Sequence, residues 1–279
     1  MKKFLMRWGL FLAMVIGAVV ILLTAYLIHH HFRQIVIQRT QEQLATIADS
    51  ASKSITSTVL AVQSDLQVLA LNPLIPEYIK EKKNLSVIAQ KWLFSIKNTL
   101  QKSNTAADAI YMLDTEGNVR SRIPFKKNWI GHNYGHKPSV KYVLQNRKTC
   151  ITEVTTDSGV SSIAICVPVF QEGKFIGALR TLVRFEHIGK LLGAIRFGEN
   201  GHAELVNTRS GEILYHSSEV RDCPTNNWKS FPQVFEKIST GKSGVGVYFT
   251  PEHNYRIIAF TPLNISIEPW MVLITMPYD

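Results

Sequence analysis

The chain has 279 residues, of which 46% are hydrophobic and 19% are charged, a composition typical of a folded protein and not of a disordered one. Its formal net charge is +10, an excess compatible with anionic lipid headgroups, with anionic ligands or only with solubility. No basic helix or ladder of alternating aromatic and basic residues accompanies the charge, so we expect no nucleic-acid partner.

An uncharged apolar segment, residues 8–28, opens the chain. As a helix it is long enough to cross a bilayer core of about 30 Å. Lys2, Lys3 and Arg7 precede it, which favours a cytoplasmic amino terminus. A cleaved signal peptide is the alternative, but the apolar run exceeds a typical signal core and no A-x-A-like site follows it. We therefore expect a single-pass anchor in the inner (plasma) membrane, with the main domain extracytoplasmic.

A long stripe of apolar residues at helical spacing follows the anchor, and no Gly or Pro interrupts residues 32–71. Its members are Leu44, Ala48, Ala51, Ile55, Val59, Val62, Leu66 and Leu69. Asn72-Pro73 should end this helix, because proline disfavours helical geometry in the residue before it. The stripe can pack on its own domain, or it can also form a seam between two chains, since its spacing is close to a heptad. On the second interpretation we expect a homodimer through the long helix.

Beyond a second expected helix near residues 85–101, the apolar period changes to two, which indicates strands. The first unit should contain strands at 109–113, 118–123, 150–156, 161–170 and 174–183, with a short helix at 138–145. The turns at 114–117, 157–159 and 171–173 are short, so neighbouring strands should be antiparallel.

The same plan then recurs, which is a strong internal repeat. The second unit should contain a strand, turn and strand from residue 203, a helix at 231–238, and strands at 244–250, 255–261 and 270–276. We expect an α+β fold with two antiparallel sheets of about five strands and helices on one face of each. The expected divisions are 1–7 cytoplasmic tail, 8–28 transmembrane helix, 32–71 long helix, 72–196 membrane-distal module and 197–279 membrane-proximal module.

Three local motifs carry a family resemblance: Ile-Gly-His-Asn-Tyr at 130–134, Ala-Ile-Cys-Val-Pro-Val-Phe at 164–170, and Gly-Lys-Phe-Ile-Gly-Ala-Leu at 173–179. Their order and spacing resemble the double Cache domain, a tandem of extracytoplasmic PAS-like modules, over residues 30–279. The resemblance implies a sensory input module like those of chemoreceptors, sensor histidine kinases and diguanylate cyclases. Such proteins usually continue through a second membrane helix into a cytoplasmic output.

In PAS-like modules the ligand pocket lies between the concave face of the sheet and the loop and helix that cover it. The candidate ligand-binding residues are Tyr111, Trp129, Tyr134, His136, Lys137, Tyr142 and Arg180. Aromatic side chains can enclose a small ligand while cations bind its carboxylate or phosphate. Arg180 lies among apolar neighbours, so it either reaches solvent at the sheet edge or meets a buried anion.

The family's amino-acid binders are similar to one another in an Arg and aromatic pair in the short helix and an Asp on the last strand. Here Lys137 stands where that Arg would be, Ser139-Val140 replaces the aromatic residues, and residues 179–184 contain no Asp. A carboxylate or another plain anion therefore suits this chain better than an amino acid.

The sequence shows no common catalytic signature, and we expect neither enzymatic activity nor a cofactor. His132 and His136 are four apart but precede Pro138 in a loop, so we expect no metal site. Three cysteines do not make a disulfide framework. A hairpin centred on Gly159 would place Cys150 and Cys166 diagonally, so we expect free thiols.

Two functions are compatible with these features. The first is extracytoplasmic sensing of a small anionic metabolite as the input for transmembrane signal transduction. The alternative is a membrane-anchored interaction or scaffold protein, in which the pocket is vestigial and the long helix recruits a partner.

Overall fold

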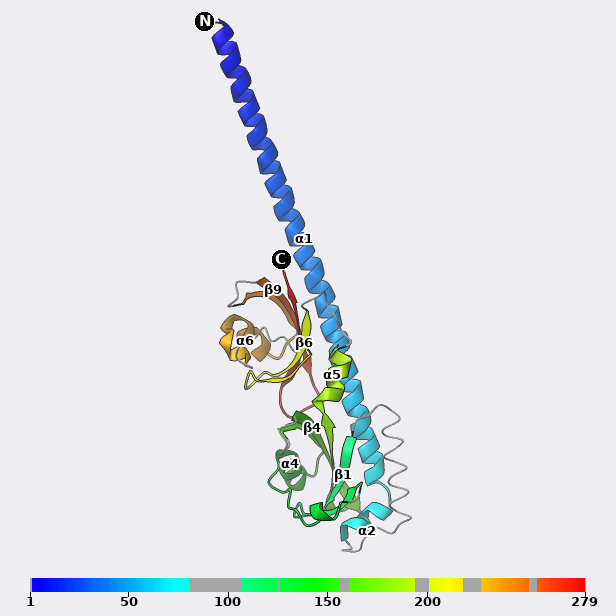
Figure 1. The fold of residues 1–279 in the computed structure, drawn as a ribbon. Coiled ribbons are helices and arrows are strands. Elements are labelled where there is room, and N and C mark those ends of the chain that lie inside the picture. The colour runs from blue at the N-terminus through cyan, green and yellow to red at the C-terminus, as the bar shows by residue number, and fades with distance from the viewer. Residues whose placement is uncertain are drawn as a thin grey trace.

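The computed structural model describes residues 2–80, 107–124, 126–155, 161–193, 201–217, 227–250 and 255–278. One long helix, α1 (Lys2–Ala70), carries two antiparallel sheets one after the other along its second half. Figure 1 shows the first half of α1 extending well beyond the sheets. The expected α+β class with two five-stranded sheets is confirmed.

Helix α1 joins the expected anchor and the expected long helix without a break. Between residues 14 and 36 every side-chain position except Gly17 is exposed, although most of these residues are apolar. By length and composition this helix qualifies as a membrane span. It ends at Ala70, just before Asn72-Pro73, and Asn72 N donates a hydrogen bond to Leu69 O at 3.0 Å.

The apolar stripe of α1 packs inside the protein. All eight of its residues, from Leu44 to Leu69, are buried in one core cluster with residues of both sheets. Burying a large aliphatic side chain stabilises a protein by about 1.5–3 kcal/mol, so this stripe is a main source of stability. The prediction that the stripe forms a seam between chains is therefore wrong, because its own sheets already cover it.

The first sheet has the strand order β2-β1-β5-β4-β3. Its strands are β1 (Ala107–Leu113), β2 (Val119–Ile123), β3 (Cys150–Thr155), β4 (Ser161–Gln171) and β5 (Lys174–Arg184). Between β2 and β3 the chain forms the short 3-10 helix η1 (Lys127–Trp129) and helix α4 (Pro138–Asn146). Pro138 begins α4 as expected, since its fixed φ suits the first helical position.

The second sheet repeats this order as β7-β6-β10-β9-β8. Its strands are β6 (His202–Asn207), β7 (Ile213–His216), β8 (Gly244–Phe249), β9 (Tyr255–Leu263) and β10 (Trp270–Pro277). The 3-10 helix η2 (Trp228–Ser230) and helix α6 (Pro232–Ser239) take the places of η1 and α4. The predicted internal repeat is thus confirmed in three dimensions.

Helices cover both faces of each sheet, not one face as expected. On one face α1 packs against β4, β9 and β10, while α4 and α6 pack on the opposite faces. The described positions of β6 and most positions of β10 are accordingly buried on both sides. Alternating residues of the same strand therefore belong to different core clusters.

Three further expectations have different outcomes. The expected helix at 85–101 and the turn at 157–159 lie outside the described residues. Two short helices, α2 (Leu74–Lys80) and α5 (Phe185–Gly193), were not anticipated.

Cys150 pairs directly with Cys166, not diagonally, because the β3–β4 register differs by two residues from that of a hairpin centred on Gly159. Both thiols are free, as expected, and both are buried.

Candidate functional site

Five side chains form a row across the first sheet. Tyr111 on β1 is the cross-strand partner of both Arg122 on β2 and Arg180 on β5. Arg180 in turn pairs with Cys166, and Cys166 pairs with Cys150 at the far edge. Directly opposed residues of an antiparallel sheet point to the same face, so the whole row faces away from α1.

Aromatic rings from the segment after β2 cover this row. The ring of Tyr134 lies 5.4 Å from that of Tyr111, and the ring of Trp129 lies 6.0 Å from it. Trp129 and Tyr134 are themselves 6.4 Å apart, and all three pairs have the edge-to-face geometry that aromatic rings prefer. Trp129 and Tyr134 thus lie over the row, and together with Tyr111 they form a group of three rings beside the arginines, which we call the aromatic cage.

Both arginines of the row are buried. Arg122 is 8% exposed and Arg180 only 4%. Arg122 Nη1 donates a hydrogen bond to Pro124 O at 2.6 Å, and its guanidinium lies 5.4 Å from the ring centroid of Tyr111. Arg180 Nε donates to Ser139 Oγ at 3.4 Å, and its guanidinium lies 5.3 Å from the ring centroid of Tyr134.

Their contacts are with neutral groups. Among the described residues, neither Arg122 nor Arg180 forms an ion pair with a carboxylate. Burial lowers the pKa of Arg180, because desolvation disfavours the charged guanidinium. Of the two alternatives for Arg180, the one in which it reaches solvent at the sheet edge is wrong, because Arg180 is buried and β5 is the central strand. The site therefore combines two desolvated cations with aromatic walls.

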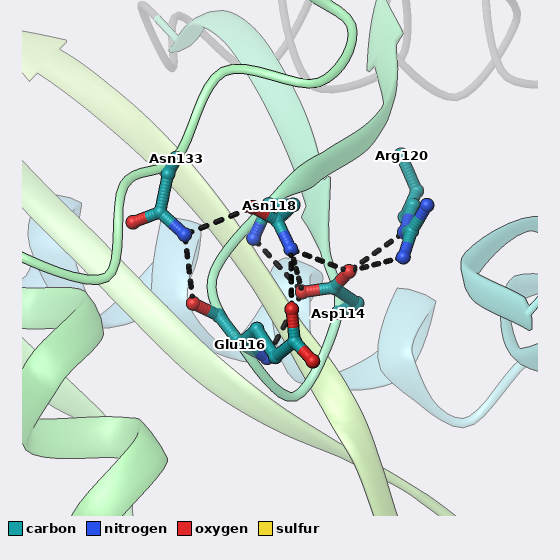
Figure 2. A network of polar contacts seen from close by, with 5 residues as sticks. All are labelled: Asp114, Glu116, Asn118, Arg120 and Asn133. Carbon is teal, nitrogen blue, oxygen red and sulfur yellow. Dashed lines mark hydrogen bonds and ion pairs between the residues drawn. The ribbon is translucent and has the colours of Figure 1, made fainter.

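A network of polar contacts holds the loop that carries Tyr134 of the aromatic cage (Figure 2). At the β1–β2 turn, Asp114 Oδ1 accepts hydrogen bonds from the backbone N of Glu116 at 2.9 Å and of Asn118 at 2.8 Å. Arg120 Nη2 contacts Asp114 Oδ2 at 2.6 Å. From the loop, Asn133 Nδ2 donates to Glu116 O at 3.0 Å and to Asn118 Oδ1 at 2.9 Å. The turn and the loop are thus tied together next to Tyr134.

The backbone makes the same connection. Tyr134 N donates a hydrogen bond to Gly117 O at 2.8 Å, and Val119 N donates to His132 O at 2.9 Å. Gly117 has a φ of 84°, and a Cβ at this position would lie only 2.6 Å from Gly135 Cα. Only glycine permits both this conformation and this approach. The position of Tyr134 over the sheet therefore depends on the β1–β2 turn, which contains Gly117, 17 residues earlier in the chain.

The structure brings together four of the seven candidate residues: Tyr111, Trp129, Tyr134 and Arg180. Tyr142, on α4, is partly buried and packs against the same apolar cluster. Lys137 is half-buried and directly precedes α4. His136 is exposed, and no described hydrogen bond, ion pair or ring contact joins it to the row.

Sequence reasoning missed Arg122. Counting back from the Leu113–Val119 pair at the turn places Ser121 opposite Tyr111. A β-bulge between Met112 and Leu113 shifts the register by one residue and brings Arg122 there instead. The sequence does show an arginine in a short predicted strand, which could have marked it as a candidate. It shows no pattern that predicts the bulge, and the bulge decides which residue lies opposite Tyr111.

Solved structures of sensory domains share this fold. The ligand binding domain of the Pseudomonas aeruginosa PAO1 amino acid chemoreceptor PctB, in complex with L-Arg, matches with a TM-score of 0.63 and 15% identity over 87% of this chain and 97% of that one. The periplasmic sensory domain of the Campylobacter jejuni chemoreceptor Tlp1 matches with a TM-score of 0.60 and 16% identity, covering 86% of this chain and 95% of that one.

A third match is longer than this protein. The chain spans 40% of an extracellular ligand binding receptor from Desulfohalobium retbaense DSM5692, with a TM-score of 0.64, 14% identity and 84% of this chain covered. At such identities these likenesses establish the fold alone. No curated protein sequence matches the chain significantly.

The family assignment comes from the sequence model of the Cache domain, which matches residues 30–279. This match covers both sheets and all of α1 beyond the apolar segment, in agreement with the resemblance noted in the sequence. The chain therefore belongs to the Cache domain family.

Proposed function

We propose that this chain is the membrane-anchored, extracytoplasmic input of a signalling protein, and that its first sheet binds a small anion. The observation that carries the proposal is the pair of buried arginines, Arg122 and Arg180, on either side of Tyr111. A buried cation without a partner of opposite charge is costly, and an anionic ligand would supply that charge.

The chemistry of the site suits a carboxylate or a related oxyanion. Guanidinium groups bind such anions through charge-assisted hydrogen bonds, often with two parallel contacts. The aromatic cage would exclude water from the bound anion, which strengthens these contacts. The ligand is expected to be small, because the ring centroids of Trp129 and Tyr134 are only 6.4 Å apart above the sheet and leave little room between the rings.

One structural neighbour contains L-Arg. An amino-acid ligand needs an acidic partner for its ammonium group, and the row presents cationic, phenolic and thiol groups instead. Asp114 is the described carboxylate nearest in sequence to Tyr111, and it is bound to Arg120 and to the backbone of the β1–β2 turn. This difference supports a plain anion over a zwitterionic amino acid.

The membrane arrangement is part of the same proposal. The basic residues before the apolar segment favour a cytoplasmic amino terminus, which places both sheets outside the cytoplasm. The modules at 72–196 and 197–279 would then be membrane-distal and membrane-proximal, because Figure 1 shows the first sheet at the end of α1 far from the amino terminus. On this arrangement the proposed anion site would lie in the membrane-distal module.

Isothermal titration of the full chain in detergent tests this function. The probes are acetate, pyruvate, succinate and inorganic phosphate, with acetamide as a neutral comparison. Removing a charge-assisted contact costs about 1.5–3 kcal/mol. For whichever of these anions the parent chain binds, R122A and R180A should therefore each lower the affinity by ~10–100-fold. The matched control is K229A, which removes an exposed cation from the second sheet unit and should change little.

Two results would contradict the proposal. Equal affinity in all three variants would place the ligand elsewhere. Binding of acetamide as tightly as of any anion would show that charge does not determine recognition.

A further inference from the structure

Two histidines and a glutamate form a second, chemically different cluster on the second sheet. His202 and Glu204 are two residues apart on β6, so their side chains share a face, and Glu204 is the cross-strand partner of His216 on β7. His202 Nε2 lies 3.4 Å from Glu204 Oε1, and His216 Nε2 lies 3.1 Å from the same oxygen. One ligand atom from each residue lies within 4.8 Å of the other two.

The cluster is buried beneath the covering segment of its unit. The side chains of His202, Glu204 and His216 are 3%, 1% and 8% exposed. Above them Trp228 of η2 is also buried, and its Nε1 donates a hydrogen bond to Glu204 Oε2 at 2.6 Å. This contact orients the carboxylate and leaves Oε1 directed at the two imidazoles.

The distances between these three side chains are compatible with metal binding. Glu204 Oε1 is fully buried, and the Nε2 atoms of both histidines lie against it. In a tetrahedral zinc site with bonds of about 2.0–2.1 Å, ligand atoms lie about 3.3 Å apart, close to the two separations observed here. We propose that His202, Glu204 and His216 bind a divalent transition metal, zinc in the first instance, with one coordination position left open.

A hydroxyl group and a guanidinium group lie next to His202. Thr275 Oγ1 lies 2.9 Å from His202 Nε2 and 3.3 Å from His202 Nδ1, so its hydroxyl group contacts the imidazole edge between the two nitrogens. Arg256 Nη2 lies 3.4 Å from the same Nδ1, so the environment also contains a fixed positive charge. That charge favours an anionic or hydroxide ligand in the open position over a second neutral imidazole. The Glu204 carboxylate balances part of the metal charge.

Direct metal binding to the full chain in detergent tests the proposal. His29, His30 and His31 are exposed and adjacent, and they could compete for the metal. Every protein used in this experiment therefore also contains the substitutions H29S, H30S and H31S. Zinc is titrated against a chromophoric chelator, and cobalt is added separately because tetrahedral cobalt has a characteristic visible absorption. We expect one zinc per chain and a cobalt spectrum of tetrahedral type.

The variants H216A and E204Q should each weaken zinc binding by about 100-fold or more, since even the loss of an outer-shell partner costs about 10–100-fold. E204Q keeps a hydrogen-bond acceptor for Trp228, so a loss of zinc binding in this variant reports on the ligand and not on the fold. Circular dichroism checks that H216A is folded. The matched control, H136A, removes an exposed histidine of the first unit and should bind zinc normally. Equal zinc affinity in E204Q and H136A, or the absence of a one-to-one site in the parent protein, would overturn the proposal.

Discussion

Glu204 holds in the second sheet the position that Tyr111 holds in the first. Each lies three residues before the Asn or Asp that begins the following turn, and each faces a basic or titratable residue on the short edge strand. Tyr111 faces Arg122, and Glu204 faces His216. One repeated fold thus presents an arginine and aromatic site in one unit and a histidine and carboxylate site in the other.

The Asp114 network should contribute to stability in a pH-dependent way. Burial raises the pKa of Asp114, but hydrogen bonds from Asn118 and Glu116 and the charge of Arg120 outweigh it, so the pKa is lowered. A lowered pKa means that the stabilisation is present above the ordinary value near 4 and is lost as the pH falls through the native value. D114N should lower the free energy of unfolding by about 1–2 kcal/mol at pH 7, as measured by urea unfolding.

This difference between D114N and the parent should shrink as the pH falls below about 4, because the parent carboxylate then becomes protonated. E116Q is the matched control, since Glu116 is exposed and its side chain accepts only from Asn118 among the described contacts. A D114N protein as stable as E116Q at pH 7 would show that the network does not stabilise the turn.

The two sides of α1 should respond differently to a charge. Ile55 is completely buried in the shared core, whereas Leu60 is 43% exposed. I55D should destabilise the protein by more than about 4 kcal/mol and prevent folding, because it buries an unpaired carboxylate. L60D should leave the melting temperature of the detergent-solubilised chain almost unchanged.

The same L60D protein tests the homodimer, which remains a prediction. Because the stripe is buried, a dimer through the long helix has to use the exposed side of α1, where Leu60 and Val68 lie. Chemical crosslinking in membranes should capture a dimer of the parent chain and less of the L60D protein. Undiminished crosslinking in L60D would place the contact elsewhere, and no crosslinking of the parent would contradict dimerisation.

Cys150 and Cys166 should be unreactive in the folded protein. Burial raises the pKa of Cys150 to about 11 and that of Cys166 to about 12, and a protonated thiol is a poor nucleophile. Mass spectrometry after iodoacetamide treatment at pH 8 should show both alkylated only after unfolding. A linked Cys150–Cys166 peptide in unreduced protein would contradict free thiols.

These raised pKa values also have a consequence for alkaline stability. The folded state retains protons that the unfolded state loses, so the free energy of unfolding should fall as the pH rises from about 9 towards 11. Replacing both thiols in C150A/C166A should reduce this dependence. An identical pH profile for the parent and the double variant would mean that other groups cause the change.

The carboxyl end of the described chain should lie on the same side of the membrane as the sheets. Arg33, just after the apolar segment, hydrogen-bonds to Tyr278 and lies over its ring, 5.0 Å from the centroid. A reporter enzyme that is active only outside the cytoplasm, fused after residue 279, should therefore be active. Activity of a cytoplasm-only reporter at that position would refute the proposed topology.

Much of the architecture was readable from local patterns. The apolar stripe predicts α1, the period of two predicts nearly all the described strands, and the turn and proline signals give their ends to within about two residues. Four candidate site residues, Tyr111, Trp129, Tyr134 and Arg180, also lie close together. The alternation along β5 and the family resemblance both predict that the ligand-binding residues lie on one face of the first sheet. These features depend on spacing within one segment, which the chain order itself specifies.

Only the tertiary structure decided which side chains face one another. In both hairpins a β-bulge, after Met112 and after Leu205, shifts the register by one residue and sets Arg122 opposite Tyr111 and His216 opposite Glu204. The stripe of α1 likewise looks the same in sequence whether sheets or a second helix cover it. Register and partner choice depend on packing between segments far apart in the chain, so the period of the apolar residues determines the elements but not the chemistry they bring together.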